Sequence, residues 1–193
     1  MNEMVTYLLP YLFVAVVVIG FVFWSKRDPN REIPITGIVA PADGKISVLR
    51  KEVNGKVRVG VFMNVYDVHV NRAPMSGYVK EIEHIPGGFL PAFSKESDRN
   101  ERVKIIFTTV DPMGKFKEKK GEEWEVVLIA GALARRIKPY IKMGDHIERG
   151  ERIGHIEFGS RVDVVFPTGR GIEEVLVKRG ERVRAGESIL MEN

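Results

Sequence analysis

The chain has 193 residues and a formal net charge of +4, which suits one globular domain with an appendage. Hydrophobic residues make up 44% of it and charged residues 29%, a balance that excludes a wholly disordered chain. It has no cysteine, which excludes disulfides and thiolate metal sites. Its lysines and arginines alternate with glutamates, a pattern that favours a solvated surface with affinity for anionic lipid headgroups over a nucleic-acid-binding surface.

The first predicted element is a membrane anchor. Met4–Trp24 is a run of 21 residues without a charge, and a helix of that length, at about 1.5 Å per residue, spans a hydrocarbon core of about 30 Å. A cleaved secretory signal is the alternative, but signals begin with positive charge, and Glu3 is the only charge before the run. Because Lys26, Arg27 and Arg31 all follow the run, we expect the main domain on the cytoplasmic side of a cell membrane.

Beyond an anchor and juxtamembrane linker, residues 1–30, we predict a mainly β domain over residues 31–193. Short segments rich in Val and Ile are bounded by Gly, Pro, Asp and Asn, a pattern typical of strands joined by tight turns. The predicted strands are Val57–Val61, Gly77–Ile82, Val103–Thr108, Glu125–Ile129, Val162–Phe166 and Glu174–Val177. Leu133–Lys142 fits no single type of element.

An internal repeat indicates the kind of β domain. Residues 142–153 and 178–189 share the pattern Lys-x-Gly-acid-x-aliphatic-x-x-Gly-Glu-x-Ile. Two glycines six residues apart around one buried aliphatic side chain predict two tight reversals, since glycine adopts positive φ at little cost. The pattern resembles the turns of barrel-sandwich, biotinyl/lipoyl-like β domains, although the lysine context of a biotinyl or lipoyl carrier is not evident. Two unrelated glycine hairpins are the alternative.

Two stretches carry polar residues that a scaffold does not require. Asp43 lies in a turn, Pro41–Lys45, where a bond to its own backbone is the alternative. Further on, strand alternation puts Asp67, His69 and Asn71 on one face. Such a face is costly to bury unless its groups are paired, so we expect it to line a site, with a satisfied structural histidine as the alternative.

Two later stretches also carry candidate chemistry. Residues 93–102 are mostly a predicted solvated loop whose arginines can hold a phosphate or carboxylate. Gly159-Ser160 interrupts what is otherwise one strand, which by itself is typical of a plain turn. A bend there can press the serine hydroxyl against the preceding carbonyl. Attack gives an ester, elimination gives a dehydroalanyl end, and hydrolysis with loss of ammonia leaves a pyruvoyl ketone able to form a Schiff base.

Together and in this order, these stretches resemble the phosphatidylserine decarboxylase family, in particular its short branch, whose archaeal members are archaetidylserine decarboxylases. The motifs are Pro41-Ala42-Asp43-Gly44, Asp67-Val68-His69-Val70-Asn71-Arg72-Ala73-Pro74, Asn100-Glu101-Arg102 and Phe158-Gly159-Ser160-Arg161. The resemblance implies cleavage between Gly159 and Ser160 into a β chain, 1–159, and an α chain, 160–193. The cofactor is then a pyruvoyl group derived from Ser160, and we expect no metal.

The resemblance also implies roles for individual residues. Asp43 matches the acidic residue used for self-processing, and His69 the histidine that assists proton transfer. We assign substrate binding to Asn71, Arg72, Arg102 and Arg161.

This sequence departs from the longer relatives at two positions. They have a second histidine where this chain has Arg72, and Gly-Ser-Thr or Gly-Ser-Ser where it has Gly-Ser-Arg. The general base therefore stays open between His69, His84 and His155.

The expected activity is pyruvoyl-dependent conversion of a serine phospholipid, with diacyl or archaeal ether tails, to the ethanolamine phospholipid. The serine amine condenses with the ketone, carbon dioxide leaves, and a proton donor, His69 by preference, quenches the carbanion. We expect the two cleaved chains to remain together as a heterodimer, with a homodimer as a further possibility. The alternatives are a membrane-tethered lipoyl-like adaptor and a Ser160 hydrolase, which lacks the Gly-x-Ser-x-Gly elbow.

Overall fold

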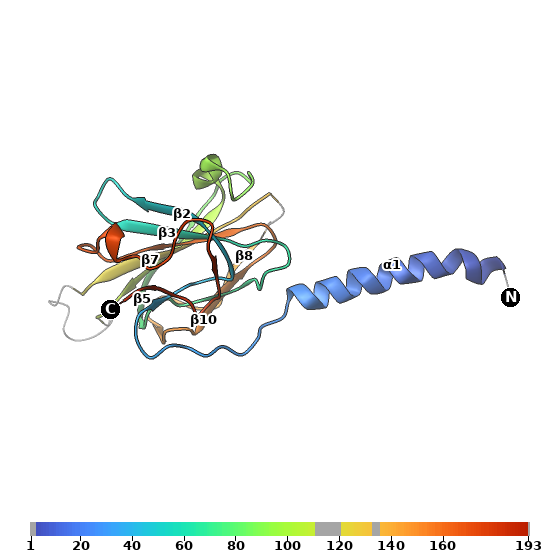
Figure 1. Ribbon diagram of the computed structural model, residues 1–193, viewed down its shortest axis with the longest axis horizontal. Helices are drawn as coiled ribbons and strands as arrows, with labels where there is room; N and C mark the ends of the chain where they lie inside the picture. Colours follow the sequence, from blue (N-terminus) through green and yellow to red (C-terminus); the bar gives the residue numbers. More distant parts are fainter. Residues whose placement is uncertain (1–2, 111–120, 133–135, 193) are drawn as a thin grey trace.

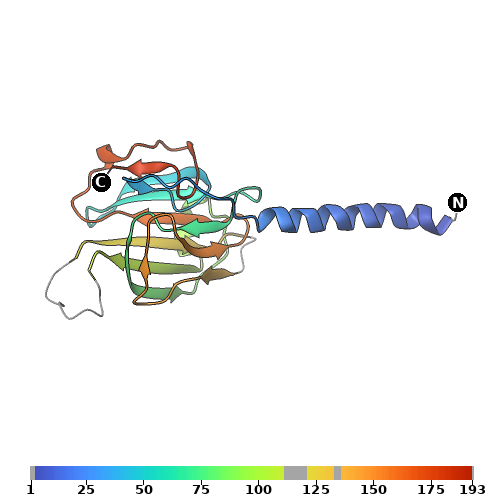
Figure 2. The same cartoon turned by 90° about the horizontal axis from the view of Figure 1, so that it is seen from below.

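The computed structural model describes residues 3–110, 121–132 and 136–192. An N-terminal helix, α1 (Glu3–Ser25), projects from a β domain, and the C-terminus lies on the opposite side of that domain (Figures 1 and 2). Residues Tyr7–Trp24 of the helix are long and apolar enough to cross a membrane, and none of this window is buried against the protein. The predicted N-terminal apolar helix is therefore present, and its exposed apolar surface suits association with a membrane.

The domain is mainly β, as predicted. Among the described residues, eight strands form a curled sheet in the order β12-β2-β3-β11-β7-β6-β5-β9, beside a sheet β4-β10-β8 and a pair β1-β13. The strands are β1 (Ile38–Val39), β2 (Gly44–Lys51), β3 (Val57–Phe62), β4 (Val70–Arg72), β5 (Gly77–Ile85), β6 (Arg102–Thr108), β7 (Glu123–Ile129), β8 (Ile137–Pro139), β9 (His146–Ile147), β10 (Arg152–Ile156), β11 (Arg161–Val165), β12 (Arg182–Val183) and β13 (Ile189–Met191). Two 3₁₀ helices, η1 (Lys95–Arg99) and η2 (Ile172–Glu174), interrupt the loops.

Strand β11 lies at the centre of the large sheet. It pairs antiparallel with β3 on one side and β7 on the other, and all five of its residues are buried. The core around it contains large apolar side chains, including Phe107 and Trp124, whose rings stack with centroids 5.5 Å apart. Strand β11 is paired on both edges and covered by protein on both faces, so its backbone is held in a fixed position. Ser160, which comes directly before β11, is fixed with it.

Two sequence predictions about strands were wrong. The segment Glu174–Val177 forms no continuous strand: Glu174 ends the short helix η2, which the bond from the Gly171 N–H to the Glu174 carboxylate caps at 2.5 Å, and Val175 makes only an isolated antiparallel bridge to Met191. The alternating strand predicted across Asp67 to Arg72 begins only at Val70, because the Asp67 carboxylate accepts a bond from the Asn64 N–H and holds a turn.

Part of one further prediction cannot be compared with the structure. Within the ambiguous segment 133–142, residues 133–135 lie outside the described residues, and Ile137–Pro139 forms β8. The other predicted strands correspond to β3, β5, β6, β7 and β11.

The repeated glycine pattern forms the same reversal twice. The Gly150 N–H donates to the Ala73 carbonyl and the Gly186 N–H to the Ala40 carbonyl, both at 2.8 Å. The four turn glycines all have positive φ: Gly144, Gly150, Gly180 and Gly186. The prediction of two tight reversals is confirmed.

The linker, residues 26–37, is fastened to the domain over these turns. Ile33 occupies the space that side chains would fill at Gly150 and Gly186, since a Cβ at either would lie 2.5 or 2.8 Å from it. Arg31 donates to both carboxylate oxygens of Asp43 at 2.9 Å. These contacts fix where the chain enters the domain, and therefore where the C-terminal end of helix α1 lies.

Candidate active site

The interruption predicted at Gly159-Ser160 is present between β10 and β11. Gly159 has a φ of +69°, in the left-handed region that favours glycine. Ser160 is fully buried, and its carbonyl accepts a bond from the Met63 N–H at 2.9 Å. The bend therefore separates two strands that could otherwise run on, and it places the serine hydroxyl inside the protein.

The carbonyl of Gly159, which precedes Ser160, lies against the backbone of Gly131. A Cβ at Gly131 would lie 1.7 Å from the Gly159 oxygen and 2.7 Å from its carbonyl carbon. Only glycine permits so close an approach. No local sequence pattern points to Gly131, because its position beside Gly159 follows from the pairing of β7 with β11.

Three of the predicted site residues have buried polar atoms without partners. Both ring nitrogens of His69, the hydroxyl of Ser160 and the Oδ1 of Asn71 make no hydrogen bond with any described residue. Leaving a buried polar atom unpaired costs about 1–3 kcal/mol. Because most buried polar groups in proteins are paired, the unpaired atoms of these three residues suit contact with a ligand or a reacting group.

His69 is enclosed by the segment that leads to Ser160. The Phe158 ring meets it edge-on with centroids 5.1 Å apart, and the Ile156 N–H donates to its carbonyl at 3.3 Å. Burial lowers the pKa of His69 to about 4, the charges of His155 and Arg27 add to that shift, and the backbone of Asp67 and the Asp43 carboxylate oppose it. At neutral pH the imidazole is therefore uncharged, and it can accept a proton.

The other candidate histidines have different surroundings. The ring of His155, on β10, lies 6.2 Å from that of His69. His84 is exposed on β5, where its Nε2 lies 3.1 Å from the Glu101 carboxylate. The structure thus brings His155 next to His69 and leaves His84 on the outside of the sheet.

Asp43 and Arg72 bind the linker and the repeated turns. Besides its pair with Arg31, Asp43 accepts a bond from the Ala185 N–H at 2.8 Å. Arg72 donates to the Gly150 carbonyl at 2.8 Å and to the Asp28 carboxylate at 2.6 Å. No bond joins either residue to His69 in the part of the chain that the structure describes.

Arg161 is buried in a network of charges. It donates to both carboxylate oxygens of Asp163, at 2.8 and 3.0 Å, and to the Ser97 hydroxyl at 2.6 Å. Asp163, with no exposed side-chain surface, also accepts a bond from Arg58 at 3.1 Å. Arg102 donates to backbone carbonyls of Asp98 and Asn100 in the neighbouring loop. All three candidate substrate-binding arginines, Arg72, Arg102 and Arg161, therefore have protein partners.

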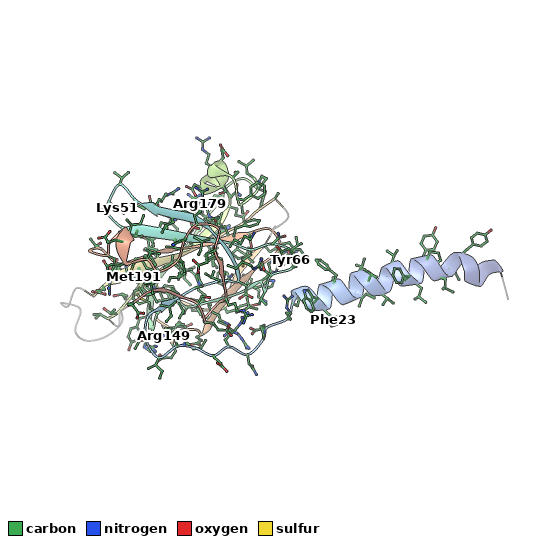
Figure 3. All side chains as sticks on the ribbon, in the orientation of Figure 1. Phe23, Lys51, Tyr66, Arg149, Arg179 and Met191 are labelled. Atoms are coloured by element: carbon green, nitrogen blue, oxygen red, sulfur yellow. The ribbon has the colours of Figure 1, made fainter. Side chains whose placement is uncertain are left out.

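The end of the anchor helix contacts this region. Phe21 stacks on Phe158 with ring centroids 5.5 Å apart, and Arg27 donates to the Tyr66 carbonyl at 2.8 Å. Figure 3 shows Tyr66 at the edge of the domain that faces the helix, near Phe23. Since Phe158 also touches His69, one aromatic side chain joins the helix to the candidate site.

Among the residues that the structure describes, no three histidine, aspartate or glutamate side chains lie close enough together to hold an ion. The Ser160 hydroxyl, buried and without a partner in the described part of the chain, fits the formation of a pyruvoyl group from that serine.

Known proteins resemble the chain over nearly all of its length. A family model described as phosphatidylserine decarboxylase matches residues 18–191. A protein of Halobacterium salinarum named archaetidylserine decarboxylase proenzyme is 51% identical over 181 residues, which cover 94% of this chain and 85% of that protein. A phosphatidylserine decarboxylase proenzyme of Streptomyces avermitilis is 47% identical over 163 residues, which cover 84% of this chain and 70% of that protein. The matched region extends from α1 to β13 and contains every residue of the candidate site.

Proposed function

This chain belongs to the phosphatidylserine decarboxylase family, and on that premise we propose that it is a self-processing proenzyme that converts a serine phospholipid to the ethanolamine phospholipid. The observation that carries this proposal is the buried, unpaired hydroxyl of Ser160 at a glycine bend, two residues after Phe158, whose ring contacts the buried neutral His69. Nothing in the comparisons favours the adaptor or the hydrolase.

Self-processing begins with transfer of the Ser160 hydroxyl proton to the neutral imidazole of His69. The oxygen attacks the Gly159 carbonyl carbon, the C–N bond to Ser160 breaks, and the proton goes to the departing nitrogen, which leaves an ester. Loss of the Ser160 α-proton expels the Gly159 carboxylate and gives dehydroalanine. Water then replaces the nitrogen, ammonia leaves, and residue 160 becomes the pyruvoyl end of the α chain, 160–193.

The pyruvoyl group supplies an electrophilic ketone that binds the serine amine and accepts the electrons released with carbon dioxide. His69 must take up a proton before it can return one to the substrate, since its low pKa keeps it neutral at pH 7. Asp43 acts on His69 through its charge, which favours the protonated imidazole. Asn71 has a free Oδ1 for the substrate amine. Arg72, Arg102 and Arg161 bind substrate only by exchanging their present partners.

The sheet topology supports a stable heterodimer after cleavage. Strand β11 of the α chain lies between β3 and β7 of the β chain, and β12 pairs with β2. Breaking one peptide bond before β11 leaves these pairings intact, so we infer that the fragments stay together without a covalent link.

We also infer a barrel-sandwich arrangement for the repeated turns. The segments before the turns exchange backbone bonds: the Val39 N–H donates to the Pro74 carbonyl and the Arg72 N–H to the Pro41 carbonyl. Both segments contain the sequence Ala-Pro-x-x-Gly, at residues 40–44 and 73–77. A repeated sequence with reciprocal pairing supports two related halves around Ile33.

A membrane anchor suits a substrate whose tails stay in the bilayer. We infer that the catalytic domain lies on the cytoplasmic side, since the basic residues Lys26, Arg27 and Arg31 all follow the helix. The contact of Phe21 with Phe158 keeps the site within reach of headgroups at the membrane surface.

The proposal is tested by assaying the purified full chain with a serine phospholipid in neutral detergent micelles. We expect carbon dioxide and ethanolamine lipid from the wild type and neither from Ser160→Ala. Cyanoborohydride added with the substrate should attach the lipid amine to the 160–193 fragment. Decarboxylation by the Ser160→Ala variant would refute the proposal.

A further inference from the structure

A pocket of about 410 Å³ lies between the end of the anchor helix and His155. Lys26, the first residue after the helix, lines it together with Arg136 and Lys138 at the start of β8. His155 of β10 and Glu157 are also in its wall. The pocket therefore draws on the linker and on two adjacent strands of the three-stranded sheet.

The cations in this pocket lack carboxylate partners. Lys26, Arg136 and Lys138 form no ion pair and no side-chain hydrogen bond within residues 3–110, 121–132 and 136–192. Glu157 is the one carboxylate that lines the pocket, so three positive charges face one negative charge. Such an excess of positive charge in a concave site favours an anionic ligand.

The pocket adjoins the candidate active site. Val70, directly after His69, lines it, and the His155 ring lies 6.2 Å from the His69 ring. Burial lowers the pKa of His155, and the positive charges of Lys26 and Lys138 lower it further, whereas the Glu157 carboxylate raises it. The charges that line the pocket therefore reach the histidine that lies between the pocket and His69.

The headgroup of a serine phospholipid carries an anion at a fixed place. Its carboxylate leaves as carbon dioxide, but its phosphodiester stays negatively charged from substrate to product. Three covalent bonds separate the phosphorus from the serine α-carbon, so a phosphodiester site must adjoin the reacting centre. It must also lie toward the bilayer, where the glycerol and tails are, and Lys26 marks that side of the pocket.

We propose that this pocket binds the phosphodiester of the lipid headgroup through Arg136 and Lys138, an inference that rests on the proposed function. Arg136 offers a planar pair of donors that matches two phosphate oxygens, and Lys138 adds a compact charge. Lys26 contributes from the membrane side. The competing explanation is a general attraction of these cations to an anionic bilayer.

The test compares two double variants that lose the same charge. Arg136→Gln/Lys138→Gln removes the pocket cations, and Lys178→Gln/Lys51→Gln removes two exposed cations that line neither this pocket nor the surroundings of Arg161. Both are purified as full chains and assayed on serine lipid in neutral detergent micelles. We expect KM to rise about tenfold or more for the pocket variant, with a smaller change in kcat, and to stay unchanged for the control.

A soluble probe identifies the chemical group. We expect glycerophosphoethanolamine, which has the phosphodiester, to inhibit the wild type and the control better than ethanolamine does, and the pocket variant to lose this preference. Inorganic phosphate should compete with glycerophosphoethanolamine in the wild type.

The outcomes separate this inference from the proposed function. Self-cleavage needs no phosphodiester, so a pocket variant that cleaves normally, but whose KM and inhibitor preference equal those of the wild type, overturns the phosphodiester site alone. Weaker binding to phosphatidylglycerol vesicles with an unchanged KM in neutral micelles also overturns it, in favour of general membrane attraction. A wild type that neither cleaves nor decarboxylates overturns the proposed function.

Discussion

Replacing Gly131 by alanine puts a methyl group where the Gly159 carbonyl oxygen now lies. The new Cβ would be 1.7 Å from that oxygen, whereas real Cβ atoms essentially never approach another heavy atom within 3.0 Å. The carbonyl or the Gly131 backbone must therefore move by about 1.3 Å or more. Because Ser160 attacks this carbonyl, the displacement acts directly on the reacting atoms.

Two magnitudes decide what the alanine does. Overpacking of this kind costs about 1–3 kcal/mol, while a domain of this size has about 5–15 kcal/mol of stability, so the variant stays folded. A misplacement of about 1 Å in a reacting pair slows a reaction by about 100-fold. We expect a folded precursor that cleaves itself about 100-fold more slowly than the wild type.

The assay follows precursor and fragments over time after a short pulse of cell-free synthesis. Gly88→Ala is the matched control, since its added Cβ meets only the Asn100 side chain, at 3.9 Å. Thermal unfolding of the purified variants checks that both are folded. Cleavage of folded Gly131→Ala at the wild-type rate would show that the Gly131–Gly159 approach plays no part in processing.

Three further predictions concern charge and stability. The pKa of His69 is about 4 in the folded protein and near 6.5 in the unfolded chain, so below pH 6.5 the unfolded chain binds a proton that the folded protein does not. The free energy of unfolding is therefore highest above pH 6.5 and falls by up to roughly 3 kcal/mol as the pH drops to 4. Urea unfolding should show that this loss is smaller in His69→Asn. Asp163→Ala leaves buried Arg161 without its main carboxylate and should cost about 3–5 kcal/mol in urea unfolding, whereas Glu123→Ala at an exposed pair should cost less than about 1 kcal/mol. Asp28→Ala removes the carboxylate that ties the linker to the domain, so limited proteolysis of the linker should become faster, and an unchanged rate would contradict the linker contacts.

The sequence was enough to predict features that depend on local pattern. A charge-free run predicts α1, Val- and Ile-rich segments predict β3 and β11, and glycine spacing predicts both reversals. The bend at Gly159-Ser160 was also visible, because a glycine and a serine interrupt an apolar strand pattern. Each of these signals lies within a few residues of the feature that it predicts.

The sequence failed where distant residues decide the structure. Gly131 lies beside Gly159 because β7 pairs with β11, and the hydroxyl that binds Arg161 belongs to Ser97, 64 positions away. Arg136 and Lys138 lie in a segment with no clear periodicity, so only the fold shows that they face Lys26 across a pocket.

The most direct test of the account is intact-protein mass spectrometry of the purified full chain beside Ser160→Ala. We predict two fragments, 1–159 and 160–193, the smaller lighter by one ammonia than simple hydrolysis gives, and a single uncut chain for the variant. This result would establish that Ser160 becomes the pyruvoyl group. A folded wild-type chain that stays uncut under conditions in which it decarboxylates serine lipid would contradict the account at its centre.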